Sequence, residues 1–574
     1  MPFQPLPRLL ALSAIAATIT ACTSPGSAPS AATAPAAPAA KIFVGGPIVT
    51  VDDAKPSAEA VAVRDGKIVA VGSRTEVMKL QGAATEVVDL KGRTLAPGFV
   101  DGHAHVAALG PQEVGANLLA PPDGTVNTID DLVKKLQDFA KGPDVARTGW
   151  IFGIGYDDAL LGRHPNRDDL DKVSTTVPVI AVHISGHFSA VNSAAPKKIG
   201  YTAATKDPEG GVIRRRPGTQ EPLGVNEELA SFSYLLQAVN PSKPENKDYF
   251  IKKGLELAKG FGYTTINEGR ALGFQHQDLV DQAQRGLFDI DVMSYIDYTD
   301  RKVLDTDFSK TYRNRYRVAG MKVTLDGSPQ GRTAWRTVPY LLPPDGQQAG
   351  YKGYPAIADT KLVEGLFDEA YRKGWPTKVH ANGDAAVDQM IAAIKPVHAK
   401  YGPGDRRHVL IHGQFVRRDQ LDALAAMQVV PSLFPMHTFY WGDWYGQIIG
   451  PELAAQISPM RYAIDKGLMP TSHTDAPVAL PNLMFVAYAT ANRVTRSGKV
   501  LGPDQRTTPL EAVKAITIWG ARQHFEEDRK GSITVGKLAD LVILSGDPVG
   551  GDPSKIKDIV VLETIKEGKT VYQR

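Results

Sequence analysis

Between residues 250 and 475, stretches with apolar residues at helical spacing alternate with short apolar runs typical of buried strands. The order of helix and then strand repeats in FIKKGLELAKGFGYTTINEG (250–269), LVEGLFDEAYRKGWPTKVHANGD (362–384), DQLDALAAMQVVPSLFP (419–435) and PMRYAIDKGLMPTSHTD (459–475). Such alternation predicts an α/β fold with a parallel sheet, and its length fits a (β/α)8 TIM-type barrel over residues 96–529. A doubly wound nucleotide-binding sheet is disfavoured, because no convincing G-x-G-x-x-G follows a predicted strand.

Both ends of the chain have a different pattern, with short strand-like runs broken by Gly and Asp. Residues 41–72 contain two such runs around a DGK hairpin turn, and residues 540–574 contain two more. We interpret residues 41–95 and 530–574 as one small β-sandwich domain built from both chain ends, with two unrelated β appendages as the alternative. Residues from about 106 to 250 are less regular and richer in Gly, Pro and Asp, which predicts a large insertion in an early βα loop.

The first 22 residues, MPFQPLPRLLALSAIAATITAC, have a weakly basic start, a short apolar run and small residues before Cys22. This pattern predicts a lipoprotein-type signal peptide (1–22), and residues 23–40, rich in Ala, Pro and Ser, predict a tether. Cys22 is the only cysteine, so we expect it to carry the lipid and to anchor the protein at the membrane of a bacterial cell envelope. The alternative is plain secretion after Ala21, with Cys22 incidental.

Composition narrows the class of protein only slightly. The 574 residues exceed what one core usually holds, which favours a large domain with a smaller one. A net charge of +3, without a basic run interleaved with aromatic residues, argues against nucleic acid as a partner. The sequence does not define the oligomeric state, and a homodimer is one of the alternatives.

Polar side chains of a chemically useful kind stand where the predicted barrel strands end. They are His103 and His105 in PGFVDGHAH, Lys322 in MKVTLDGS, His380 in KVHANGD, His412 in VLIHGQ and Asp475 in SHTDAPV. Barrel strands end at one mouth, where imidazole and carboxylate groups can bind a divalent metal such as zinc. Taken singly, each residue has a plainer alternative: a hydrogen-bonded histidine, Asp475 as a helix cap, or Lys322 paired with Asp326.

This ordered set resembles the metal-dependent amidohydrolase superfamily. The segments SGHFSAVNS (185–193), EPLGVNEELA (221–230) and 507–544 are similar to its long YtcJ-like branch (amidohydrolase family 3), which contains N-substituted formamide deformylases. The resemblance implies a first metal on His103, His105 and Asp475, and a second on His380 and His412. It also implies that Lys322 bridges the two as an N-carboxylated lysine. The implied cofactor is two Zn²⁺ ions per chain, with Mn²⁺ or Fe²⁺ as alternatives.

The implied activity is hydrolysis of a carbon–nitrogen, amide-like bond, other than a peptide bond, in a small molecule. Asp475 would move the proton from water to the leaving group, and His187 would contact the substrate or its oxyanion. The alternative for His187 is a hydrogen-bonded histidine within the insertion. Alternative functions are an esterase, lactonase or deaminase on the same site, or an inactive binding lipoprotein of the cell envelope.

Two departures from the branch leave the substrate pocket open. Ile411 stands where the branch often has an acidic residue, and His473 and Thr474 stand where it often has Gly-Ser. His473 lies two residues before Asp475, so we expect it near the metal site or the substrate. The aromatic run 434–446, which includes His437, either lines the pocket or packs against the insertion.

Overall fold

The computed structural model describes residues 37–208, 210–344 and 346–574, and residues 38–574 form one compact unit. The predicted signal peptide, Cys22 and most of the tether lie outside the described residues. No helix within the described ranges combines the length and the apolar character needed to cross a membrane. The domain boundaries stay predictions.

Eight parallel strands form the central sheet, in the order β19-β18-β17-β16-β15-β14-β13-β6. Their bounds are β6 (Phe99–Val100), β13 (Tyr263–Ala271), β14 (Asp291–Asp297), β15 (Tyr316–Thr324), β16 (Thr377–Ala381), β17 (Val409–His412), β18 (Val430–Leu433) and β19 (Thr471–Ser472). The segments after the two outer strands also meet: the Asp475 N–H donates to the His103 carbonyl (3.2 Å), and the His105 N–H donates to the Ala476 carbonyl (2.8 Å). The curled sheet therefore fits a TIM-type barrel, as the α/β alternation predicts.

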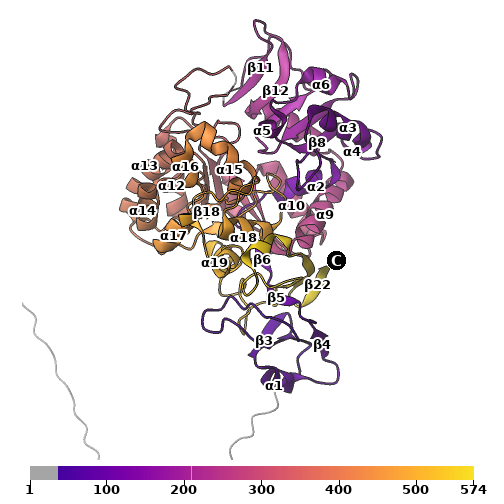
Figure 1. The fold of residues 1–574 in the computed structure, drawn as a ribbon, viewed down its shortest axis with the longest axis vertical. Coiled ribbons are helices and arrows are strands. Elements are labelled where there is room, and N and C mark those ends of the chain that lie inside the picture. Colours follow the sequence, from indigo (N-terminus) through magenta and orange to yellow (C-terminus); the bar gives the residue numbers. More distant parts are fainter. Residues whose placement is uncertain (1–36, 209, 345) are drawn as a thin grey trace, which may run out of the picture. The chain divides into compact units, whose positions relative to one another are not determined.

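Helices between the strands and after the last of them cover the barrel (Figure 1). They include α9 (Pro244–Gly260), α10 (Gly273–Gln284), α11 (Leu304–Asp307), α12 (Thr360–Lys373), α13 (Asp384–Tyr401), α14 (Arg418–Ala426), α15 (Met436–Ile449), α16 (Pro451–Ala455), α17 (Met460–Asp465), α18 (Leu483–Asn492), α19 (Pro509–Ala515) and α20 (Ile518–Gln523). In α12, Val363, Leu366, Phe367 and Ala370 recur at helical spacing and are buried. A helix with this spacing has one apolar face, and that face packs against the sheet.

Two four-stranded sheets come from the two chain ends. The first has the order β3-β2-β1-β4, with β1 (Lys41–Val44), β2 (Ala60–Arg64), β3 (Lys67–Gly72) and β4 (Glu86–Asp89). The second has the order β22-β21-β20-β5, with β5 (Thr94–Pro97), β20 (Leu541–Leu544), β21 (Val561–Lys566) and β22 (Lys569–Gln573). Phe43 and Ile68 share one hydrophobic cluster with Ile543 and Ile565, so both chain ends contribute to the same core (Figure 1).

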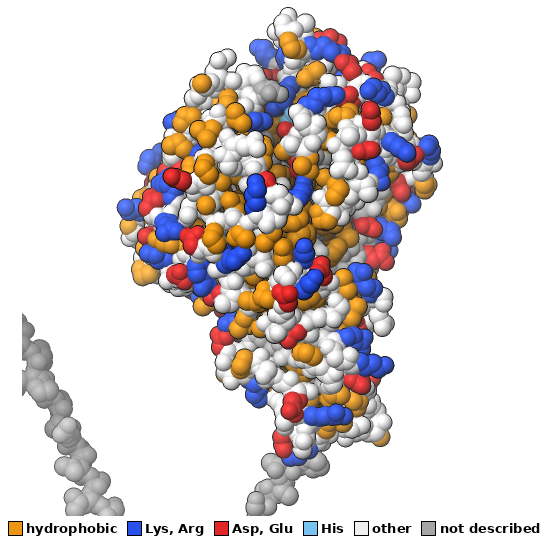
Figure 2. Space-filling model, in the orientation of Figure 1, with side chains coloured by type: hydrophobic (Ala, Val, Ile, Leu, Met, Phe, Trp, Pro, Cys, Tyr) orange, Lys and Arg blue, Asp and Glu red, His pale blue; other side chains and the backbone are white. Residues whose placement is uncertain are grey.

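A fourth sheet comes from the part of the chain between β6 and β13, where the sequence predicts an insertion. Its order is β11-β12-β10-β9-β8-β7, with β7 (Ala116–Asn117), β8 (Ile151–Tyr156), β9 (Val179–His183), β10 (Phe188–Val191), β11 (Gly211–Arg215) and β12 (Pro222–Glu228). The accompanying helices are α2 (Val106–Val114), α3 (Ile129–Phe139), α4 (Val145–Thr148), α5 (Asp158–Leu161), α6 (Arg167–Asp171), α7 (Ala194–Ile199) and α8 (Leu229–Val239). On the surface seen in Figure 2, side chains of both charge signs are interspersed with apolar ones.

Candidate metal centre and active site

The segment after β6 places His103 and His105 at the mouth of the barrel. The Asp101 carboxylate accepts a hydrogen bond from the His103 N–H (3.0 Å) and also binds the Asn267 side chain (2.9 Å), which fixes the strand end. The two imidazole rings lie 5.0 Å apart, centroid to centroid. Behind His105, the Glu268 carboxylate lies 3.1 Å from Nδ1 and leaves Nε2 facing the centre.

Asp475 lies between the histidines at the centre of the site. Its Oδ1 atom is 3.4 Å from Nε2 of both His103 and His105, and its Oδ2 atom is 3.9 Å from Nε2 of His412. Its φ of 52° lies in the left-handed region, which residues other than glycine rarely adopt. Where they do adopt it, the residue is often part of a functional site. Oδ1 accepts no hydrogen bond from the described residues, although it is buried.

His103, His105 and Asp475 offer one ligand atom each, and these three atoms lie within 4.8 Å of one another. Two imidazole nitrogens and a carboxylate oxygen are suitable ligands for a divalent metal ion. A metal ion would also satisfy the unpartnered oxygen of Asp475. The donor set therefore fits a divalent metal.

The second histidine pair comes from neighbouring strands. His380 in β16 and His412 at the end of β17 have ring centroids 4.6 Å apart. His473 lies behind this pair: its Nε2 is 3.2 Å from Nδ1 of His412, and its Nδ1 is 2.9 Å from the Ser432 hydroxyl. His473 thus contacts the metal site, one of the two roles expected for it, and orients His412.

Lys322 projects from β15 into the same centre. Its Nζ atom lies 3.2 Å from Nε2 of His103, and the side chain is buried. The Asp326 carboxylate instead accepts backbone N–H groups, including those of Trp335 and Gly383. The structure thus places Lys322 with the histidines rather than in the alternative pair with Asp326. Burial lowers the pKa of Lys322 to about 7, so a neutral amine is accessible near neutral pH.

Burial also shifts the pKa values of the histidines and so affects their protonation. It lowers the pKa of His103, His380 and His412 well below the usual value, and the Lys322 charge adds to the effect. These imidazoles are therefore neutral, which is the form that binds metals. His105 differs: burial lowers its pKa, but the neighbouring carboxylates of Asp475 and Glu268 outweigh burial and raise it to about 9. A metal ion bound here would replace that proton.

His187 reaches the site from the insertion. It follows β9, and its ring lies 5.6 Å from that of His380, centroid to centroid. Its Nδ1 atom is 2.5 Å from Oε2 of Glu228, at the end of β12. Burial lowers the pKa of His187, but the charge of Glu228 outweighs burial and raises it. The ring can therefore carry a proton toward a developing negative charge on a substrate.

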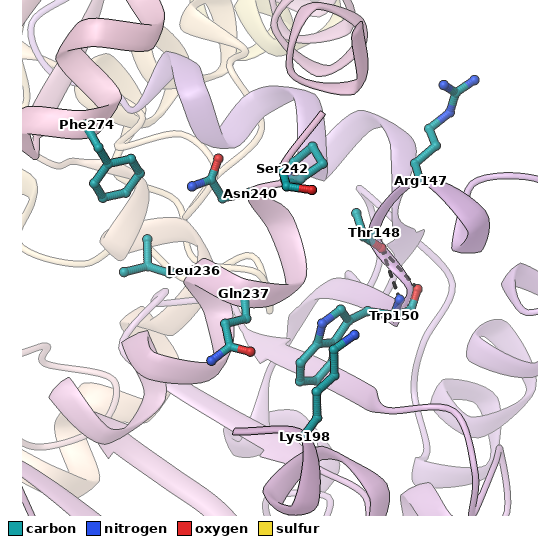
Figure 3. A pocket seen from close by; sticks show the side chains of 10 residues that line it. Arg147, Thr148, Trp150, Lys198, Leu236, Gln237, Asn240, Ser242 and Phe274 are labelled. Atoms are coloured by element: carbon teal, nitrogen blue, oxygen red, sulfur yellow. Dashed lines mark hydrogen bonds between the residues drawn. The ribbon is translucent and has the colours of Figure 1, made fainter. Parts of the chain in front are cut away.

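A cavity of about 380 Å³ opens onto these side chains. One wall is apolar and comes from α8, with Leu229, Phe232, Leu235 and Leu236. Leu236 also lines a separate hollow, where Figure 3 shows it with Gln237, Trp150 and Lys198. A pocket of this size with an apolar wall and a few polar groups is typical of small-molecule sites.

The aromatic run 434–446 combines its two expected roles. Most of it forms α15, in which Trp441 donates to the Asp157 carboxylate of the insertion (3.1 Å) and Tyr440 donates to Asp123. None of its residues lines the 380 Å³ cavity, but Phe434 and His437 line a smaller pocket beside it, together with His380, His412 and Asp475. The run therefore packs against the insertion and also reaches the site, and most of it is a helix rather than a loop.

Gly269 makes room for His103, which gives a first prediction. A methyl group at this position would lie 2.1 Å from Cε1 of His103. We expect Gly269→Ala to displace the imidazole, lowering both bound metal and hydrolytic activity at least about tenfold. Metal analysis of the purified variant measures this, with Gly446→Ala, where a methyl group meets open space, as the control. Full metal content in Gly269→Ala would contradict the placement of His103.

A parallel barrel with imidazole and carboxylate groups at its mouth defines a metal-binding barrel protein. A sequence profile of the amidohydrolase family matches residues 86–572, so the chain belongs to that family and is accordingly a hydrolase. This confirms the resemblance seen in the sequence.

Relatives match over nearly the whole length. The chain is 26% identical to YtcJ of Bacillus subtilis (strain 168), covering 93% of this chain and 99% of the relative. It is 25% identical to the N-substituted formamide deformylase of Arthrobacter pascens, covering 93% and 98%. Its fold matches the crystal structure of an uncharacterized metal-dependent hydrolase from Pyrococcus horikoshii OT3, with a TM-score of 0.70, 22% identity and coverage of 93% and 100%.

Proposed function

We propose that this hydrolase cleaves a carbon–nitrogen, amide-like bond of a small molecule with two divalent metal ions, zinc by preference of the donor set. The observation that carries the proposal is the position of Asp475, whose two oxygens face His103 and His105 on one side and His412 on the other. A carboxylate in this position can serve two metal ions and a water molecule between them.

Each remaining side chain has a role in this proposal. His103, His105 and Asp475 would hold the first ion, and His380 and His412 would hold the second. Lys322, carboxylated on Nζ, would supply carbamate oxygens to both ions. Its burial beside His103 supports the carbamate, because the neutral amine is the form that reacts with CO₂.

The reaction adds water across the C–N bond. When bound, the metal ions polarise the substrate carbonyl and make the attacking water more acidic. Asp475 accepts the proton from that water and then donates it to the departing nitrogen. His187, held by Glu228, donates a hydrogen bond to the substrate oxygen. The products are a carboxylate and an amine.

A hydrolysis screen with metal removal tests the proposal. The metal-loaded protein is assayed on formamides, N-acyl amino acids, cyclic amides and esters, before and after dialysis against a chelator. We expect at least one amide to be hydrolysed, a loss of about a hundredfold or more after chelation, and recovery with added Zn²⁺ or Mn²⁺. Turnover that survives complete metal removal would refute the metal-dependent mechanism.

The arrangement of the whole chain is part of the same proposal. The two sheets from the chain ends form a small β-sandwich domain, residues 106–250 form the insertion over the barrel mouth, and lipid on Cys22 anchors the enzyme in the cell envelope. Incorporation of a labelled fatty acid tests the anchor. Cys22→Ser should abolish the label, and equal labelling of the two proteins would contradict the anchor.

A further inference from the structure

One charged side chain of the cavity has no part in the proposed mechanism. Arg270 lies near the end of β13, two residues after Glu268, and both side chains line the cavity. It lines the cavity together with the metal-site residues, and its side chain is 29% exposed. Its positive charge lowers the pKa of Lys322, after the larger effect of burial, which places the guanidinium within electrostatic reach of the centre.

The guanidinium is fixed but not saturated. Its Nε atom donates to Oδ2 of Asp297 at 2.6 Å, and its central carbon lies 5.5 Å from the ring centroid of Phe232. Among the described residues, no side chain or carbonyl accepts a hydrogen bond from the two terminal nitrogens. An arginine held through Nε presents a planar pair of donors, and such a pair matches the two oxygens of a carboxylate.

The negative groups nearby are already engaged. Asp297 is paired with Arg270 itself and also accepts the Thr299 hydroxyl (2.7 Å). Glu268 binds His105 and the Ala107 N–H (3.0 Å), and Glu228 binds His187. Each of these three carboxylates therefore has its own partner. None of them accepts a hydrogen bond from the terminal nitrogens of Arg270, so these can bind a further carboxylate. Next to it, α8 supplies the apolar wall of the same cavity.

We propose that Arg270 binds a carboxylate of the substrate, and that the substrates are N-acyl amino acids with an apolar side chain or acyl group. This inference rests on the proposed function, because the scissile amide must lie at the metal centre while the carboxylate lies on Arg270. In the reaction, water adds across the acyl C–N bond. The acyl group leaves as a carboxylate, and the free amino acid leaves with the proton delivered to its nitrogen.

A matched pair of probes tests the carboxylate site. N-acetylphenylalanine, as each enantiomer, and N-acetyl-2-phenylethylamine differ only in the carboxylate. For the metal-loaded protein we expect kcat/KM to be at least about tenfold higher for one enantiomer of the acid than for the neutral amide. In Arg270→Met this ratio should fall by about tenfold or more, while Arg270→Lys should retain part of it. Arg285→Met is the control and should keep the wild-type ratio, because Arg285 directly follows α10 and pairs with Asp248 at the surface.

A binding measurement separates this inference from the proposed hydrolysis. Calorimetry on the metal-loaded Asp475→Asn protein compares the dissociation constants of the same probes, with and without Arg270→Met. Tighter binding of the acid than of the amide, if it depends on Arg270, supports the carboxylate site whether or not the probes are hydrolysed. Failure of the wild-type protein to hydrolyse either probe would count against the proposed function instead. Equal binding of acid and amide, or a preference that survives Arg270→Met, would overturn the inference.

Discussion

Asp475→Asn is expected to lower kcat about a thousandfold or more, the largest effect of any single substitution. The amide has nearly the shape of the carboxylate but cannot accept the proton of the attacking water. It also offers a weaker oxygen to the metal ion that His103 and His105 hold. Both losses act on the transition state, so kcat and kcat/KM should fall together.

Kinetics on the best substrate of the screen measure this effect. Asp465→Asn is the matched control, because Asp465 is an exposed aspartate near the end of α17, where it pairs with Arg461. The control should keep wild-type kcat. Full turnover by Asp475→Asn would show that the proton transfer has been assigned to the wrong residue.

Lys322→Ala is expected to lose about one metal ion per chain and most of the activity, because it removes the carbamate that is proposed to serve both ions. Short carboxylic acids such as acetate should restore part of the activity, since they can place a carboxylate in the vacated space. Wild-type protein equilibrated with ¹³C-labelled bicarbonate should show a carbamate resonance that Lys322→Ala lacks.

Lys400→Ala serves as the control for Lys322→Ala. Lys400 lies on the surface of α13 and pairs with Asp368 (2.6 Å), so its removal should change neither metal content nor rate. An unchanged metal content in Lys322→Ala, together with the absence of a carbamate resonance, would contradict the bridging role.

The barrel could be predicted from the sequence because its signal is local. Each helix carries an apolar stripe that is buried when the helix packs against the sheet, as in α12. Each strand is a short apolar run. The metal-ligating side chains stand at the ends of those runs. The carboxyl ends of parallel barrel strands lie at the same mouth of the barrel. The position of His103, His380 and Asp475 at such strand ends therefore predicts that they converge.

The supporting residues could not be predicted in this way. Glu268 orients His105 from 163 positions along the chain, and Glu228 holds His187 from 41 positions away. Neither residue stands in a local pattern that indicates its partner. Two clues were present: NEG (267–269) lies near the end of the strand 263–271, and EPLGVNEELA contains Glu228.

The apolar wall of the cavity was also missed. It belongs to α8, inside an insertion whose irregular sequence gives no clear helix period, and its most exposed apolar residue, Leu229, is 45% exposed. The aromatic run 434–446 contributes Phe434 and His437 to a smaller pocket of the site. Its Tyr440 and Trp441 pack against the insertion instead, a contact between distant segments that only the tertiary fold defines.

The metal content of the purified protein tests the central claim most directly. Elemental analysis of the full chain, expressed with zinc in the medium, should give about two divalent ions per chain, and His380→Ala should give about one. One ion in the wild-type protein would remove the bridging role of Lys322. Protein that is folded and free of metal would contradict the account of the site.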